Sequence, residues 1–170
     1  TSVSQATAAA SSSQNQSKYE ANVASVAGKM DNRVIAAYQQ LGFKLVVDPS
    51  VNYSGYFDAR SRSITMKQID DSVYHELGHF LAFIAGNADK TASFQSIFAA
   101  EKANVTAFNK AYVTQNASEY FAESVKDYIL NNASLKSSRP QTYAAVQNAL
   151  NQITHAQIAK IQKIYGAFWN

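Results

Sequence analysis

The fold is decided by the stretch SVYHELGHFLAFI at residues 72–84. Its apolar side chains recur every three or four positions, the spacing of an amphipathic helix that buries one face. The middle of the stretch, HELGH at residues 75–79, matches the pattern HExxH. Positions i and i+4 share one face of a helix, so His75 and His79 can bind the same ion. The stretch therefore predicts a helix that packs into the core and holds a metal ion, which for this motif is zinc.

The glutamate of the motif, Glu76, makes the predicted centre catalytic. It follows the first histidine directly, so it can reach a water molecule beside the ion and act as a general base. The chain has three histidines among 170 residues. Chance would produce the motif in roughly one or two of a thousand chains of this composition. We therefore expect a catalytic zinc centre rather than two unrelated histidines on a helix.

The third zinc ligand has to come from outside the motif, because a catalytic zinc site has three protein ligands and one open position. The chain has no cysteine. Ala82 and Ala85 stand where a metzincin would have a glycine and a histidine, which excludes that class. The remaining histidine, His155, falls in a predicted helix near the C-terminus, where we expect it to be exposed. The third ligand should therefore be a carboxylate.

Two glutamates compete for this position. Glu101 lies 22 residues after His79, near the spacing of thermolysin-like enzymes, whereas Glu119 lies 40 residues after it. Glu123 follows Glu119 by four positions, so the two carboxylates share a helical face. One can bind the metal while the other accepts a hydrogen bond from the outer N–H of a liganding histidine. Glu101 has Val105 at the equivalent place, and we favour Glu119 for that reason.

The rest of the chain predicts an α+β fold, with a small, mostly antiparallel sheet packed by several helices that include the zinc-binding helix. The apolar run at residues 43–47 predicts a strand, and residues 55–67 predict a hairpin. In its second strand, residues 63–67, polar residues alternate with Ile64 and Met66. This alternation suggests a strand at the sheet edge, along which an extended peptide substrate could pair.

Helices account for most of the remaining sequence. Asp71 or Ser72 is the predicted N-cap of the zinc-binding helix, and Thr154 is the predicted N-cap of the last one. A first helix begins near Asp31 and ends at Gly42. The other predicted helices cover residues 72–85, 92–111 with a break, 118–131, 140–150 and 155–168.

Composition excludes several classes of protein. The net charge is +3 and charged residues make up 16% of the chain, with no cluster of basic residues, so nucleic-acid binding is not expected. No stretch approaches the roughly 20 apolar residues that span a bilayer. Residues 1–17 contain no charged side chain, and we expect a disordered leader there followed by a single domain at residues 18–170. Such a leader is typical of exported bacterial proteins, so we expect a secreted protein from which a signal peptide has been removed. We also expect a monomer.

Five parts of the sequence together resemble a known family. They are HELGH at residues 75–79, Tyr112, EYFAE at residues 119–123, the hairpin at residues 55–67 and RPQTY at residues 139–143. This combination is similar to the catalytic domain of anthrax lethal factor and to the bacterial Pro-Pro endopeptidases. In that family a tyrosine stands seven residues before the third zinc ligand, as Tyr112 does before Glu119.

The resemblance covers roughly residues 30–150 and implies a zinc peptidase of the gluzincin type. It implies one Zn²⁺ bound by His75, His79 and Glu119. It implies Glu76 as general base, Tyr112 as a hydroxyl that stabilises the developing oxyanion, and Glu123 as the outer partner of a liganding histidine.

We therefore expect a secreted zinc endopeptidase that acts on extended segments of extracellular proteins, with proline-rich segments as candidate substrates. One alternative is a non-catalytic zinc-binding or toxin-type interaction module of the same fold. Relatives of that kind typically lose the HExxH residues, which are intact here. A second alternative is a metal-dependent enzyme acting on another substrate class. It would need aspartates or histidines lining a sugar or phosphate pocket, and the sequence has no such cluster.

Overall fold

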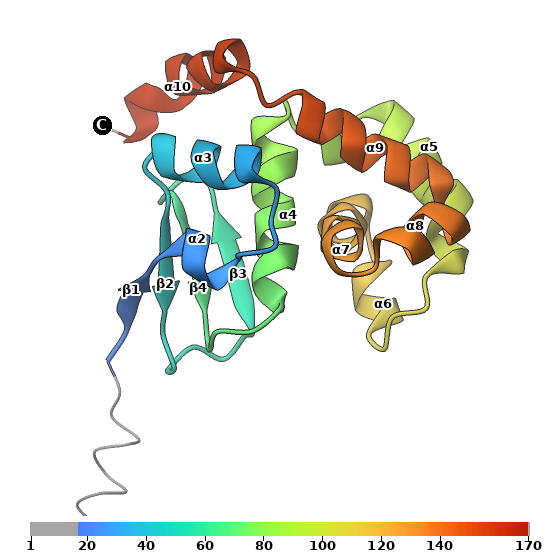
Figure 1. The fold of residues 1–170 in the computed structure, drawn as a ribbon, viewed down its shortest axis with the longest axis horizontal. Helices are drawn as coiled ribbons and strands as arrows, with labels where there is room; N and C mark the ends of the chain where they lie inside the picture. Colours follow the sequence, from blue (N-terminus) through green and yellow to red (C-terminus); the bar gives the residue numbers. More distant parts are fainter. Residues whose placement is uncertain (1–16, 170) are drawn as a thin grey trace, which may run out of the picture.

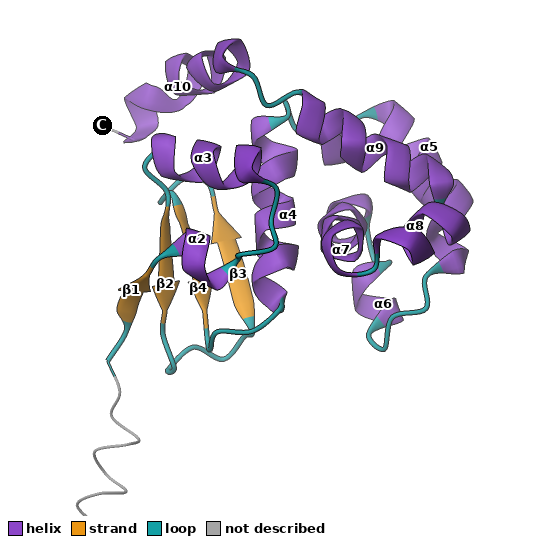
Figure 2. Cartoon of the chain, in the orientation of Figure 1, coloured by secondary structure: helices purple, strands orange, loops and turns teal. Residues whose placement is uncertain are grey.

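The computed structural model describes residues 17–169, so the disorder predicted for the N-terminal leader lies outside the described residues apart from Ser17. The described chain has an α+β fold, as predicted. A small sheet lies on one side, helix α4 (Ser72–Ile84) runs beside it, and a group of helices packs on the far side of α4 (Figure 1). Figure 2 shows the strands gathered in that one sheet.

The sheet has four strands in the order β1-β2-β4-β3. They are β1 (Tyr19–Ala21), β2 (Lys44–Val47), β3 (Gly55–Asp58) and β4 (Ser63–Met66). The β1–β2 and β3–β4 pairs are antiparallel, and β2 and β4 pair in parallel. The predicted strand near residues 43–47 and the predicted hairpin are both confirmed.

The predicted position of the second hairpin strand is wrong. We expected residues 63–67 at the sheet edge, but β4 has β2 on one side and β3 on the other. In β4 the fully buried side chains of Ile64 and Met66 alternate with the partly exposed side chains of Ser63 and Thr65. This alternation shows only that one face of the sheet is covered. A central strand of such a sheet alternates just as an edge strand does. The free edge next to α4 therefore belongs to β3.

The helices agree with the sequence pattern, with some additions. The stretch 92–111, predicted as a broken helix, forms α5, a 3₁₀ turn and α6. The short elements β1, α2 and α8 were not predicted. The helices other than α4 are α2 (Val23–Val26), α3 (Asn32–Gln40), α5 (Ala92–Glu101), α6 (Lys110–Val113), α7 (Ala117–Leu130), α8 (Asn132–Ser138), α9 (Pro140–Asn151) and α10 (His155–Trp169).

One of the two predicted caps is correct. Thr154 Oγ1 accepts a hydrogen bond of 3.1 Å from Gln157 N and so caps α10. At the start of α4, Asp71 makes no side-chain capping bond. Asp70 takes this role instead, because its Oδ1 atom accepts a bond of 2.9 Å from the backbone N–H of Ser72. Cap predictions that are one residue out are common, since Asp and Ser fit several positions of the same turn.

Helix α4 packs against β3 on one side and α7 on the other, which makes it the centre of the core. Most of its residues are buried, including Leu77 and Phe80. Gly78 allows α4 and α7 to approach closely, because a Cβ atom there would be 2.6 Å from the carbonyl oxygen of Ala122. This approach brings the side chains of the two helices within reach of each other. No helix in the described part of the chain has the length and apolar character needed to cross a membrane.

Candidate metal centre

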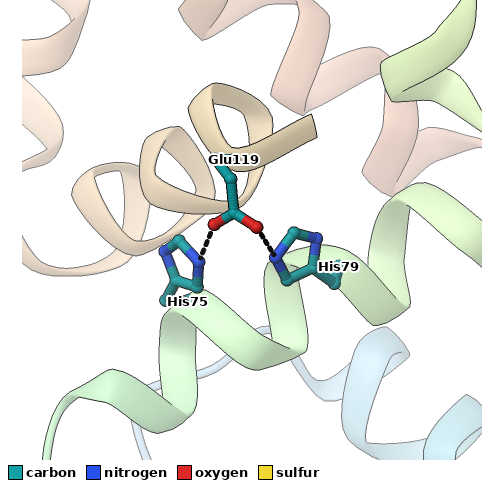
Figure 3. A group of neighbouring side chains, drawn as sticks. All are labelled: His75, His79 and Glu119. Carbon is teal, nitrogen blue, oxygen red and sulfur yellow. Dashed lines mark hydrogen bonds and ion pairs between the residues drawn. The ribbon is translucent and has the colours of Figure 1, made fainter. Parts of the chain in front are cut away.

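The two histidines of α4 and one glutamate of α7 converge on one point. His75 Nε2 lies 2.9 Å from Glu119 Oε2, and His79 Nε2 lies 3.4 Å from Glu119 Oε1. One candidate ligand atom from each residue lies within 4.8 Å of the others. Figure 3 shows the Glu119 carboxylate pointing down from α7 between the two imidazole rings of α4. Two helices that touch at Gly78 thus supply all three groups.

These three groups fit a zinc ion. Two imidazole nitrogens and one carboxylate oxygen form a donor set that catalytic zinc sites use, and it leaves a fourth position open. The carboxylate already bridges the two Nε2 atoms, so the three donors face a common centre. Burial raises the pKa of Glu119, but hydrogen bonds from His75 and His79 outweigh it and hold the pKa well below its ordinary value. The carboxylate is therefore ionised, as a ligand must be.

The outer nitrogen of His75 contacts a second carboxylate. His75 Nδ1 lies 2.9 Å from Glu123 Oε2, and the Glu123 side chain is almost fully buried. Burial lowers the pKa of His75, but its bonds to Glu119 and Glu123 outweigh that effect and raise the pKa to about 9. Metal binding at Nε2 requires this ring to lose a proton. Glu123 then fixes which nitrogen keeps its hydrogen and how the ring is oriented.

Glu76 lies beside this group, between α4 and the edge strand β3. It is buried, and burial raises its pKa above the ordinary value for a glutamate. A Cβ atom at Gly55 would lie 2.9 Å from Glu76 Cγ and 3.2 Å from Glu76 Oε1. The glycine of β3 therefore leaves the space that the Glu76 side chain fills. A buried carboxylate with a raised pKa is suited to taking a proton near neutral pH.

Tyr112 approaches the group from α6 and remains 54% exposed. Its ring centre lies 6.4 Å from the ring centre of His75. Burial, followed by the negative charge of Glu119, raises the pKa of the Tyr112 hydroxyl. The hydroxyl therefore keeps its proton and can donate a hydrogen bond to a developing negative charge.

Two clefts meet at these side chains. One, of about 290 Å³, lies between the start of β3 and α6 and is lined in part by Ser54, Asn109 and Lys126. The other, of about 170 Å³, runs along β3 past Tyr56 and Phe57. Glu76 and Tyr112 line both of them. An extended ligand lying along β3 would therefore pass directly over the candidate metal centre.

The alternatives considered for the third ligand lie elsewhere. Glu101 is buried at the end of α5, where its carboxylate accepts hydrogen bonds from the backbone N–H groups of Gln141 and Thr142. It therefore caps α9. His155 is exposed at the start of α10. The only group of three potential ligands found among the described residues is the one on α4 and α7.

Sequence reasoning missed the two glycines that shape the site. Gly78 is a glycine inside a strongly apolar helix, where it costs about 1 kcal/mol relative to alanine. That cost is itself a signal of close packing. Gly55 begins a strand, where glycine is also unfavourable and marks a place that other groups approach closely. Neither glycine, however, reveals from the sequence which residue packs against it.

A known protein family matches the part of the chain that contains this site. Residues 43–149 match the family described as "Anthrax toxin lethal factor, N- and C-terminal domain", a range that includes His75, His79 and Glu119. The chain belongs to this family. A Pro-Pro endopeptidase of Clostridioides difficile (strain 630) is 41% identical to it over an alignment of 78 residues, with coverage of 44% of the chain and 34% of the relative. The match thus takes in about a third of that protein. The family predicted from HELGH and EYFAE is confirmed.

Proposed function

We propose that this chain is a secreted zinc endopeptidase that hydrolyses peptide bonds in extended, proline-containing segments of proteins. The observation that carries the proposal is the convergence of His75, His79 and Glu119 beside a buried glutamate and an open strand edge. The name of the Clostridioides difficile relative supports peptidase activity and proline-containing substrates. Secretion rests on the sequence alone, on the uncharged composition of residues 1–17.

Each side chain has a role in the proposed reaction. Zinc held by the two histidines and Glu119 would supply Lewis-acid polarisation of the substrate carbonyl and lower the pKa of water. Glu76 takes the proton from the attacking water and returns it to the leaving amine. The Tyr112 hydroxyl donates a hydrogen bond to the oxyanion as it forms. Glu123 holds His75 in the tautomer that leaves Nε2 free.

The edge strand β3 orients the substrate in this proposal. Lys67 N donates a hydrogen bond of 3.1 Å to Ser54 O, which makes these two residues a hydrogen-bonded pair of the antiparallel ladder. Such pairs alternate, so the main-chain groups of Gly55 and Phe57 point away from β4 toward the open edge. An extended peptide can bind there by adding a strand to the sheet. Proline has no N–H to donate, so prolines fit only at substrate positions whose N–H is not paired.

The test is zinc content together with peptide cleavage. Elemental analysis of the purified chain should give one zinc, and Glu119→Ala should hold it far more weakly. A library of proline-containing peptides should be cleaved by the wild type, and a chelator should stop the reaction. One tightly bound zinc without cleavage of any peptide would favour an interaction module of the same fold. The absence of bound zinc in the purified and zinc-loaded wild type would overturn the proposal.

Gly55→Ala should lower kcat by about tenfold to a hundredfold while zinc binding is retained, because misplacing a catalytic group by about 1 Å has effects of this size. The added methyl group would lie 2.9 Å from Glu76 Cγ and 3.0 Å from Met66 Sδ, so the Glu76 side chain has to move. Steady-state kinetics and zinc analysis on the same preparation would separate these effects. Gly166→Ala is the matched control, since its Cβ would meet nothing within 4 Å. Unchanged kcat in Gly55→Ala would show that the space is not needed.

A further inference from the structure

Helix α7 carries two sets of buried polar side chains on different faces. Glu119 and Glu123 face the histidines of α4, as described above. Tyr120, Ser124 and Asp127 follow each other at intervals of four and three residues, so they share a neighbouring face. Tyr120 and Ser124 are fully buried there. This second face takes no part in the proposed chemistry, yet polar groups at such positions are costly unless each one has a partner.

The first partners come from α5 and α9. The Tyr120 hydroxyl lies 2.6 Å from Thr142 Oγ1, and Thr142 Oγ1 donates a bond of 2.7 Å to Glu101 Oε1. Glu101 also accepts bonds from the backbone N–H groups of Gln141 and Thr142. Because the Thr142 hydroxyl gives its one hydrogen to Glu101, it must accept from Tyr120. A continuous chain of hydrogen bonds thus joins the end of α5, the start of α9 and the first turn of α7.

The second partner is a buried arginine between α8 and α9. Arg139 Nη1 donates a hydrogen bond of 3.2 Å to Ser124 Oγ, and Arg139 Nη2 donates one of 2.5 Å to Asp127 Oδ2. Its guanidinium also lies over the ring of Tyr120, 5.5 Å from the ring centre. Ser124 in turn donates to the carbonyl oxygen of Tyr120. One cation therefore contacts three residues that span two turns of α7.

We propose that these six residues form an anchor that positions the candidate metal centre by fixing the rotation of α7 about its axis and its position along that axis. The α7 anchor consists of Glu101, Tyr120, Ser124, Asp127, Arg139 and Thr142. The proposal rests on the proposed function, because the groups it positions, Glu119 and Glu123, are a zinc ligand and its supporting carboxylate. All six are positioning residues, and none of them contacts the centre.

The physical reason lies in what a movement of α7 would cost. Against α4 it packs closely at Gly78, and across that contact Glu119 and Glu123 form hydrogen bonds with His75. A slide or rotation of α7 would move Glu119 and Glu123 together. The same motion would break the bonds of Tyr120, Ser124 and Asp127 and leave buried polar groups without partners, an outcome that is strongly disfavoured. The anchor thus holds α7 in register from another face, in addition to its contact with α4.

The test compares polar variants on α7 and α9 with an apolar control on α9. Tyr120→Phe and Thr142→Val each remove one hydroxyl of the anchor and keep the shape of the side chain. Thr142→Ser keeps the hydroxyl and should behave as the wild type. Val146→Ala removes buried methyl groups from α9 without touching a polar atom, because Val146 is fully buried and apolar. Zinc affinity is measured by competition with a chromophoric chelator, well below the melting temperature of each variant.

We expect the two polar variants to bind zinc about threefold to tenfold more weakly, a smaller loss than the roughly 10- to 100-fold found for groups that contact a ligand directly. Val146→Ala should lower the melting temperature at least as much and leave zinc affinity within about twofold of the wild type. Equal losses of zinc affinity in all three variants at matched destabilisation would overturn the proposal. Unchanged affinity in the two polar variants would overturn it as well.

A second measurement does not need zinc. In the metal-free protein, the ring nitrogen resonances of His75 report its bonds to Glu119 and Glu123. Thr142→Val should shift these resonances, whereas Val146→Ala should not. If the wild type bound no zinc, the proposed function would fail, but the His75 resonances would still decide whether the anchor positions the two carboxylates. Resonances that shift in neither variant would contradict the anchor.

Discussion

Glu76→Gln is expected to lower kcat by about 100-fold to 10,000-fold, the range that general acid–base catalysis contributes. The amide keeps the size of the side chain but cannot take a proton from water. Burial raises the pKa of the Glu76 carboxyl, so the native group is a better base than an exposed glutamate would be. Cleavage of a proline-containing peptide, followed over a range of substrate concentrations, would measure the loss.

Zinc binding should be unaffected by this substitution, because Glu76 is not among the three converging groups. Elemental analysis of the variant would show whether that holds. Glu20→Gln is a suitable control, since Glu20 is an exposed residue of β1 and should leave both zinc content and kcat unchanged. A Glu76→Gln protein that kept more than about a tenth of wild-type kcat would mean that another group acts as the base.

The candidate metal centre could be predicted because its residues carry strong local patterns. HELGH fixes two imidazoles on one face of a helix, and the four-residue spacing of Glu119 and Glu123 fixes two carboxylates on another. In the structure Glu123 contacts the outer nitrogen of His75 while Glu119 lies between both rings, the division of roles that this spacing suggested. Helical periodicity also placed α3, α4, α7, α9 and α10 close to their observed bounds.

Strand order could not be predicted from the same kind of pattern. Alternation describes which face of a strand is buried, and it contains no information about the neighbours on either side. The parallel pairing of β2 with β4 joins segments separated by the whole of β3, so no local signal reveals it. For this reason the sheet edge was assigned to β4, although β4 is a central strand and the edge strand is β3.

The role of Glu101 was beyond sequence reasoning for a related cause. Its partners, the backbone N–H groups of Gln141 and Thr142, lie some 40 residues further along the chain. A buried carboxylate that caps a distant helix has no spacing by which it can be recognised. The same holds for Arg139, whose contacts with Ser124 and Asp127 depend on how α7 and α9 pack. Contacts between single side chains that are far apart in the sequence can be identified only once the fold is known.

Gly78→Ala is expected to have the largest effect on stability. A Cβ atom at this position would lie 2.6 Å from Ala122 O and 2.7 Å from Ala122 Cα. Favourable contacts between carbon atoms begin at about 3.5 Å, so α4 and α7 would have to separate by on the order of 1 Å. The opposing atoms belong to the main chain and cannot rotate away as a side chain could. Alanine would also favour the helix by about 1 kcal/mol, but overpacking costs typically 1–3 kcal/mol and more where the backbone must move.

The clash should therefore dominate, and a net loss of about 1–2 kcal/mol would lower the melting temperature by about 2–8 °C, since 1 kcal/mol corresponds to roughly 2–4 °C in a domain of this size. Because the separation would move Glu119 away from His75 and His79, zinc affinity should fall as well. Thermal unfolding by circular dichroism and chelator competition would measure the two effects. Ala122→Gly should not rescue the variant, because the clash involves main-chain atoms that glycine retains. A Gly78→Ala protein with wild-type melting temperature and zinc affinity would show that the helices can part without disturbing the centre, and the close contact would then have no part in assembling it.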